Sequence, residues 1–211
     1  MFVKVCGITR REDADAAVEV GASALGFVFW PKSPRAIDPY RARAIVSSLP
    51  PFVSAVGVFV DQPAAYVNGV AGLVGLSAVQ LHGDEPVEYA AAINRPVVKA
   101  VGLRHGVAPP AGMVESWPTR VLILVDVHDP VRRGGTGRTV DWSVAAAIAR
   151  RRRVVLAGGL TPENVGEAIA RVQPFGIDVS SGVEAAPGIK DHGRIKALFE
   201  AVHGSSITAR S

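Results

Sequence analysis

Two side chains that can exchange protons lie at the ends of apolar, β-like segments. Cys6 follows Phe2–Val5, Asp126 follows Val121–Val125, and the loop after Asp126 contains Gly134–Gly137. A thiol and a carboxylate at two strand ends suit general acid–base chemistry, because one takes a proton while the other gives one. Taken singly, the thiol has a simpler interpretation as a small buried hydrophobe, and the carboxylate as a turn residue. The prediction therefore depends on the same geometry recurring along the chain.

The chain alternates short β-rich segments with longer amphipathic ones. We expect strands at 2–6, 24–29, 53–60, 77–81, 97–101, 121–126, 153–157 and 175–179. Helices are expected near 11–20, 39–48, 63–72, 86–93, 111–116, 141–150, 162–171 and 191–202. Strands separated by such helices pair in parallel through right-handed crossovers. About eight units predict a single closed (β/α)8 (TIM) barrel over 1–204, with a frayed tail at 205–211. A doubly wound open sheet is the competing architecture.

Three helix starts carry capping signals. Thr9–Glu12 has the spacing of a capping box, in which the first and fourth side chains bond each other's backbone N–H. Asp38-Pro39 and Thr161-Pro162 each place a capping oxygen before a proline at the first helical position.

Composition excludes several classes of protein. Only one of the 211 residues is cysteine, so an internal disulfide and a CxxC site are impossible. The sequence has no run of 18 apolar residues and no signal-peptide layout, and we expect a cytoplasmic protein that does not cross a membrane. The net charge of +4 includes Arg150–Arg153, which suit a helix C-terminus, and the few aromatic residues are not interleaved with basic ones. We therefore expect a small anionic ligand, not nucleic acid.

No dinucleotide fingerprint, P-loop or HExxH motif occurs, so the sequence offers no support for nicotinamide, ATP or zinc-peptidase chemistry. In such a barrel the working residues lie at the C-terminal ends of the strands. After the second strand, Arg35 in a rigid Ser-Pro-Arg segment is a candidate clamp for a carboxylate. After the fourth strand come Gln80 and His82; no partner for the histidine is evident, so a bond to backbone is its simplest interpretation.

The last two strand ends have the composition of a phosphate cradle. Gly158 and Gly159 follow the seventh strand, and Ser180, Ser181 and Gly182 follow the eighth. Glycines let backbone N–H groups approach an anion, and a short extra helix starting at Gly182 would add positive charge. The alternative is that these glycines only end strands.

Alternation along the first strand places Lys4 on the same inward face as Cys6. A lysine inside a barrel is unfavourable unless it is paired. Asp178, on the adjoining eighth strand, is its expected partner. We expect Lys4 to keep that acid ionised and to favour the thiolate of Cys6.

These motifs together resemble the phosphoribosylanthranilate isomerase family. The resemblance covers nearly the whole chain and is carried by Lys4–Thr9, Ser33–Arg35, Val79–Gly83, Asp126, Gly134–Gly137, Asp141-Trp142, Leu156–Leu160, Asp178–Glu184 and Pro187–Asp191. It implies a (β/α)8 barrel of tryptophan biosynthesis that uses no cofactor or metal and performs an Amadori rearrangement of a phosphorylated sugar. It also leaves open whether the protein is a monomer or a homodimer.

The resemblance also implies residue roles. Cys6 is the general base, Asp126 the general acid, and Arg35 the clamp for the anthranilate carboxylate. The phosphate is expected at the loops after strands seven and eight, with Gly135 and Gly137 closing over the same ligand.

Two positions depart from the family pattern: Val140 replaces a usual Phe, and Trp30 stands where smaller residues are common. Two other functions remain as alternatives. One is the related histidine-pathway aldose–ketose isomerase, or a bifunctional version, although that group carries Asp where Cys6 stands. The other is a phosphate-ligand binding barrel without catalysis.

Overall fold

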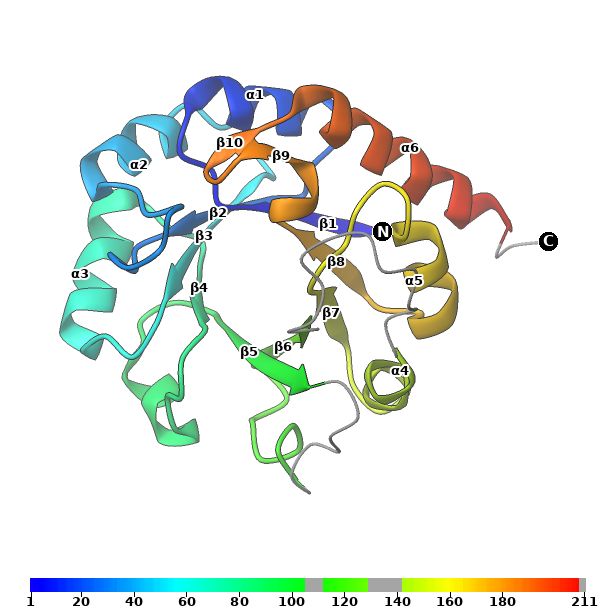
Figure 1. Cartoon of the computed structure of the whole chain (residues 1–211). Coiled ribbons are helices and arrows are strands. Elements are labelled where there is room, and N and C mark those ends of the chain that lie inside the picture. The colour runs from blue at the N-terminus through cyan, green and yellow to red at the C-terminus, as the bar shows by residue number, and fades with distance from the viewer. Residues whose placement is uncertain (105–111, 129–141, 209–211) are drawn as a thin grey trace.

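The strands form a closed parallel barrel with the helices on its outside (Figure 1). The computed structural model describes residues 1–104, 112–128 and 142–208. The strands follow one another around the barrel in chain order, and β8 pairs with β1. They are β1 (Phe2–Cys6), β2 (Ala24–Val28), β3 (Ser54–Phe59), β4 (Ala78–Leu81), β5 (Val97–Arg104), β6 (Leu122–His128), β7 (Val154–Ala157) and β8 (Gly176–Val179). The (β/α)8 barrel is confirmed, and the pairing of β8 with β1 rules out an open sheet.

Most of the expected helices are present. They are α1 (Arg11–Glu19), α2 (Pro39–Val46), α3 (Ala64–Val74), the 3-10 helix η1 (Val87–Ala92), α4 (Ser143–Ala149), α5 (Val165–Val172) and α6 (His192–Thr208). The expected helix near 111–116 is wrong: residues 112–117 form turns, and Gly112 has a left-handed φ of 77° that a right-handed helix does not accommodate. Helix α6 continues to Thr208, past the expected barrel boundary at 204.

Only one of the three expected caps is formed. Asp38 caps α2 by accepting hydrogen bonds from the N–H groups of Tyr40 and Arg41. The capping box at Thr9 is wrong, because its hydroxyl donates to the carbonyl of Gly188, 179 residues along the chain. The cap at Thr161 is also wrong, since α5 begins after Asn164.

An extra hairpin interrupts the regular alternation after β8. A single 3-10 turn, η2 (Ser181–Val183), leads into β9 (Glu184–Ala186), which pairs antiparallel with β10 (Ile189–Lys190). The expected helix from Gly182 is therefore reduced to this one turn. Gly188, at a left-handed φ of 78° after a proline, makes a turn more favourable than a helix here. In Figure 1 the hairpin lies between α1 and the start of α6.

The barrel interior separates apolar from polar side chains along its axis. Phe2 packs with Ala100, Leu124 and Val155 towards the N-terminal ends of the strands. Two and four residues further along β1, on the same face, come Lys4 and Cys6, both buried. The chemistry-bearing side chains therefore gather at the C-terminal end.

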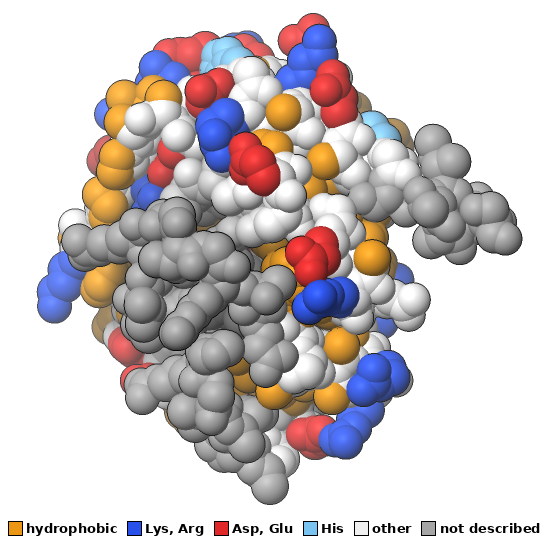
Figure 2. All heavy atoms as spheres, turned by 45° about the vertical axis from the view of Figure 1, so that its right-hand side comes forward, with side chains coloured by type: hydrophobic (Ala, Val, Ile, Leu, Met, Phe, Trp, Pro, Cys, Tyr) orange, Lys and Arg blue, Asp and Glu red, His pale blue; other side chains and the backbone are white. Residues whose placement is uncertain are grey.

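The surface carries charges of both signs. On the face shown in Figure 2, the described Lys and Arg side chains lie beside Asp and Glu. Within the basic run, Arg150 is the C-cap of α4, whereas Arg152 donates to carbonyls of the 112–121 segment and Arg153 stacks 4.1 Å over Phe175. Among the described helices, none has the length and hydropathy to span a bilayer.

Asp13 ties α1 to the extra hairpin. Its fully buried carboxylate accepts hydrogen bonds from Arg10 and from the N–H of Lys190, and it pairs with His192 at 2.9 Å. Burial alone would raise the pKa of Asp13, but the bonds from Arg10 and His192 bring it below its usual range.

We predict that Asp13→Asn lowers the free energy of unfolding at neutral pH by about 3 kcal/mol, because it breaks a buried ionic cluster. A depressed folded-state pKa stabilises the protein above the unfolded pKa, and this contribution is lost as pH falls through the folded value. The difference between wild type and Asp13→Asn should therefore shrink in acid. Urea unfolding of both proteins at neutral and acidic pH measures it; a constant difference would contradict the prediction.

Candidate active site

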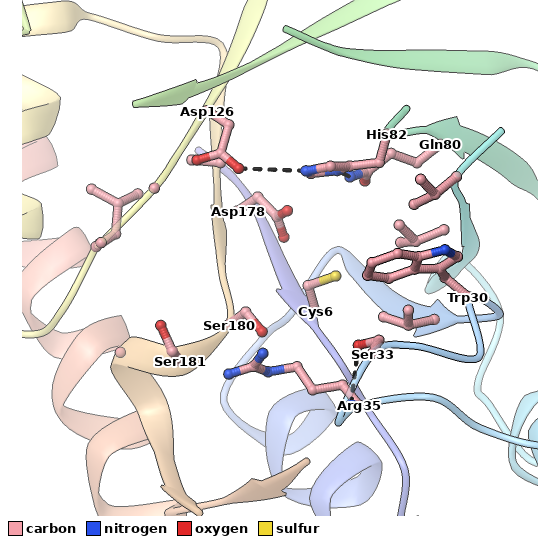
Figure 3. A pocket seen from close by; sticks show the side chains of 18 residues that line it. Cys6, Trp30, Ser33, Arg35, Gln80, His82, Asp126, Asp178, Ser180 and Ser181 are labelled. Atoms are coloured by element: carbon pink, nitrogen blue, oxygen red, sulfur yellow. Dashed lines mark hydrogen bonds and ion pairs between the residues drawn. The ribbon is translucent and has the colours of Figure 1, made fainter. Parts of the chain in front are cut away.

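A cavity of about 470 Å³ opens at the C-terminal ends of the strands. It brings together most of the residues selected from the sequence (Figure 3). Its lining consists of Cys6, Val28, Trp30, Ser33, Arg35, Val58, Val60, Gln80, His82, Asp126, Ala157, Gly158, Gly159, Leu160, Asp178, Ser180, Ser181 and Gly182. Gly135 and Gly137, expected to close over the ligand, lie outside the described residues, as does Val140.

Lys4 and Asp178 form the predicted ion pair beneath this cavity. The two residues are register partners across β1 and β8, and Lys4 Nζ lies 3.0 and 2.9 Å from the two carboxylate oxygens. Both side chains are at most 8% exposed. Burial lowers the pKa of Lys4, but Asp178 and Cys6 together raise it above its ordinary value. Burial raises the pKa of Asp178 above its ordinary value, and Lys4 opposes this shift without reversing it. The lysine itself is held as a cation directly below the thiol.

The thiol of Cys6 does not have the lowered pKa that the sequence suggested. Burial raises its pKa above the ordinary value of a thiol, and Asp178 adds to the increase. Lys4 and Lys190 oppose the shift without reversing it. Lys4 does favour the thiolate, but desolvation of the charged sulfur outweighs it.

Gly26 makes room for this thiol, which sequence reasoning missed. Gly26 is the register partner of Cys6 across β1 and β2. A Cβ at this position would meet Cys6 Sγ at 2.6 Å and the Cys6 Cα at 3.0 Å. An inward glycine beside a strand-end cysteine is the available sequence signal, but only the register shows that the two are neighbours.

Asp126 has a partner that the sequence did not reveal. His82 Nε2 lies 3.5 Å from Asp126 Oδ2, and His82 Nδ1 lies 2.8 Å from Gln80 Nε2. The expected bond from the His82 ring to backbone is wrong. With Gln80 donating, Nδ1 accepts and the ring proton is on Nε2, which faces the carboxylate. Gln80 is buried, and its Oε1 has no partner among the described residues.

Arg35 reaches the cavity with one edge of its guanidinium already engaged. Its Nε and Nη2 donate to Glu184 Oε1 and Oε2 at 2.8 and 2.7 Å. A carboxylate of the substrate cannot use that same edge, so the Nη1–Nη2 edge, with three remaining N–H groups, is left for it. Glu184, on β9, was not identified from the sequence as a site residue, and only the hairpin brings it to Arg35.

The glycine loops after β7 and β8 interlock at the rim. Gly158 and Gly159 have φ of 93° and 59°. A Cβ on Gly182 would lie 1.8 Å from the carbonyl oxygen of Leu160, so only glycine allows this approach. The N–H groups of Gly159, Ser181 and Gly182 find no acceptor among the described residues. This arrangement suits an anion held by backbone donors.

One wall of the cavity is apolar. Val28, Val58 and Cys6 form a buried cluster with Trp30 packed against it. The tryptophan that departs from the family pattern therefore belongs to the cavity wall. Within the described ranges, no three His, Cys, Asp or Glu side chains are grouped so that they could hold a metal ion.

Comparison with known proteins gives a consistent result. The family model of N-(5'-phosphoribosyl)anthranilate (PRA) isomerase matches residues 3–201. A relative of that name from Pelobacter propionicus is 48% identical over 198 residues, covering 93% of each chain. One from Geobacter sulfurreducens is 46% identical over 206 residues, covering 96% of this chain and 98% of the relative.

Solved structures that are similar to this chain give the same result as the sequence comparisons. The phosphoribosylanthranilate isomerase of Thermotoga maritima superposes with a TM-score of 0.86 at 48% identity, covering 97% of this chain and 99% of its own. This chain belongs to the N-(5'-phosphoribosyl)anthranilate isomerase family. A second family structure, in complex with reduced 1-(o-carboxyphenylamino)-1-deoxyribulose 5-phosphate, has a TM-score of 0.83 at 46% identity, with coverages of 97% and 99%.

For this family member we predict that Gly26→Ala lowers kcat by roughly 10–100-fold, because the new methyl group displaces Cys6 Sγ, and a shift of about 1 Å can cost 10²-fold. The matched control is Gly69→Ala on the exposed surface of α3, where a Cβ meets nothing within 4 Å. Steady-state kinetics of both variants test this. Normal turnover in Gly26→Ala would show that the position of the thiol is unimportant.

We also predict that Cys6 ionises at higher pH in the folded protein than in the denatured chain, because burial raises its pKa. It is the only cysteine, so alkylation by iodoacetamide reports on it alone. The alkylation rate should rise with pH later in native protein than in urea-denatured protein. A native midpoint at or below the denatured one would contradict this electrostatic description.

Proposed function

We propose that this chain isomerises N-(5'-phosphoribosyl)anthranilate to 1-(2-carboxyphenylamino)-1-deoxyribulose 5-phosphate, with Asp126 as general acid and Cys6 as general base. The observation that carries the proposal is that a thiol and a carboxylate from two non-adjacent strands, β1 and β6, line one cavity. The same cavity has an apolar wall, an arginine and a rim of N–H groups for which the described part of the chain supplies no acceptor. These are the features that an aromatic carboxylate joined to a sugar phosphate requires.

The first step opens the ribose ring. Protonated Asp126 gives its proton to the ring oxygen as the bond from that oxygen to C1 breaks, and the anthranilate nitrogen completes a Schiff base at C1. The Nε2–H of His82 faces the carboxylate that this transfer leaves behind. A hydrogen-bond donor there stabilises the charge that develops on Asp126.

The second step moves a proton from carbon. The thiolate of Cys6 removes the C2 proton, the electron pair forms a C1–C2 double bond, and the iminium nitrogen is neutralised. The resulting enolamine then tautomerises to the C2 ketone. Desolvation, which raises the pKa of Cys6 in the free protein, also makes its thiolate a stronger base once formed.

The remaining groups bind the two ends of the substrate. Trp30, Val28 and Val58 suit the anthranilate ring, and the free edge of Arg35 suits its carboxylate. At the other end, Gly158, Gly159 and the segment Ser180–Gly182 suit the phosphate. The 3-10 turn η2 is too short to contribute much dipole, so this subsite depends on individual N–H groups.

The alternatives are less well supported. The histidine-pathway isomerase resembles this group but carries Asp in place of Cys6. A barrel that only binds its ligand has no need for an acid and a base in one cavity.

For cellular context, we propose a cytoplasmic enzyme that acts on a small phosphorylated substrate. The Thermotoga maritima relative is described as dimeric, which favours a homodimer over the monomer that the sequence also left open. Sedimentation velocity measurements on the full chain test this.

We predict that Cys6→Ala and Asp126→Asn each lower kcat at least 10²–10⁴-fold, the range typical of a general acid or base, with little change in KM. Steady-state turnover of phosphoribosylanthranilate measures this, with the histidine-pathway substrate as a specificity control. Near-normal turnover in either variant would remove that residue from its role.

We predict that Gly159→Asp raises KM sharply because it adds negative charge where the phosphate is expected. Its φ of 59° is one that Asp and Asn tolerate, and a Cβ there meets nothing within 4 Å, so the fold should persist. Gly159→Asn is the matched control with equal bulk and no charge, and it should raise KM much less. Equal effects of the two variants, or normal substrate binding by Gly159→Asp, would contradict the phosphate subsite.

A further inference from the structure

Lys190, on β10, is a buried cation that the proposed mechanism does not use. Its side chain has no exposed area, and its Nζ donates to Glu184 Oε1 at 2.8 Å and to the carbonyl of Ser180 at 3.2 Å. The backbone N–H of Lys190 donates to Asp13, which anchors this end of the hairpin to α1. A lysine buried so completely is retained only where its charge has a partner and a use.

The partner of Lys190 is the carboxylate that also holds Arg35. Glu184 Oε1 accepts from Arg35 Nε, from Lys190 Nζ and, at 3.3 Å, from the N–H of Gly188. Glu184 Oε2 accepts from Arg35 Nη2. Burial alone would raise the pKa of Glu184, but these two cations lower it, so it remains a carboxylate. Glu184 thereby fixes the plane of the guanidinium and leaves its Nη1–Nη2 edge for a ligand.

The pairing of Arg35 with Glu184 also changes the net charge that a ligand meets. A bidentate Arg–Glu pair is neutral as a whole, and a neutral pair attracts a carboxylate poorly. Lys190 adds a second positive charge at Glu184 Oε1, the oxygen that also accepts from Arg35 Nε, so the three side chains together carry a net charge of +1. Burial lowers the pKa of Lys190 below its ordinary value, and its hydrogen bond to Glu184 opposes that shift.

We propose that Lys190 is a positioning residue that acts through Glu184, restoring the positive charge that Arg35 needs to select a substrate carboxylate. This rests on the proposed function in one respect, namely that Arg35 faces the anthranilate carboxylate. It assigns a role in specificity to the β9–β10 hairpin, which is not part of the regular barrel.

The test compares two ligands on folded variants. One ligand is reduced 1-(o-carboxyphenylamino)-1-deoxyribulose 5-phosphate, and the other is the same molecule with hydrogen in place of the carboxylate. Affinities are measured by calorimetry on wild type, Arg35→Ala, Lys190→Met and the double variant Glu184→Gln/Lys190→Met. Thermal unfolding confirms that each variant is folded.

We expect Lys190→Met to weaken binding of the carboxylate ligand by roughly tenfold or more, the usual effect of losing one charged interaction, and to leave the other ligand within about threefold. The double variant removes one charge of each sign and returns the net charge to +1. It should therefore recover most of the lost affinity. An equal loss for both ligands, or no recovery in the double variant, would show a purely structural role and overturn the proposal.

Arg35→Ala separates this inference from the function on which it rests. If Arg35→Ala keeps the preference for the carboxylate ligand, the assignment of Arg35 itself is wrong. If Arg35→Ala loses the preference while Lys190→Met keeps it, only the inference about Lys190 fails. Should Lys190→Met not fold, the double variant decides alone: it should retain the wild-type preference within about threefold, and a tenfold loss would overturn the proposal.

Discussion

The ion pair between Lys4 and Asp178 is the interaction on which the rest of the site depends. Two charges taken out of water are tolerated only if their geometry is good, and here the register of β1 against β8 sets them directly opposite each other. That register exists only because the barrel closes. Closure of the barrel therefore fixes both the buried ion pair and the position of the thiol above it. A shift of one residue in the pairing register of β1 would turn Lys4 and Cys6 outward.

Two opposing electrostatic effects act on the pKa of the Cys6 thiol, which lies above this pair. Desolvation and Asp178 disfavour the thiolate, whereas Lys4 and Lys190 favour it, and in the free protein desolvation prevails. The pKa of the thiol therefore lies above its ordinary value, although two nearby lysines oppose the increase. A thiolate formed there is strongly basic, which suits removal of a proton from carbon.

The groups of the site also divide by the element that carries them. Cys6, Asp126, His82 and Asp178 come from strand ends or the residue beside them, where the barrel fixes the backbone. Arg35 comes from a loop, and it gains comparable order from Glu184 on the hairpin. The hairpin is in turn held to α1 through Asp13 and Lys190, so an element outside the barrel supports part of the ligand site. Rigid placement of a loop side chain by a supporting ion pair is a general requirement for precise binding.

The alternating strand and helix periods predicted an α/β fold of about eight units and favoured the barrel over an open sheet, and the pairing of β8 with β1 confirmed closure. The sequence also indicated which strand ends carry Cys6, Asp126, Arg35 and the glycine loops. Alternation along the first strand, together with closure of the barrel, predicted the Lys4–Asp178 pair. The contacts that depend on strand register and on segments far apart in the chain became visible only in the folded protein. Thr9 caps no helix because its hydroxyl donates a hydrogen bond to the carbonyl of Gly188. His82 faces Asp126 because β4 and β6 converge on one cavity. Gly26 matters because it lies beside Cys6, and Glu184 because a hairpin, where a helix was expected, brings it to Arg35. The local sequence pattern predicts which face of a strand or helix a side chain occupies. Contacts between residues far apart in the chain depend on closure of the barrel and on packing.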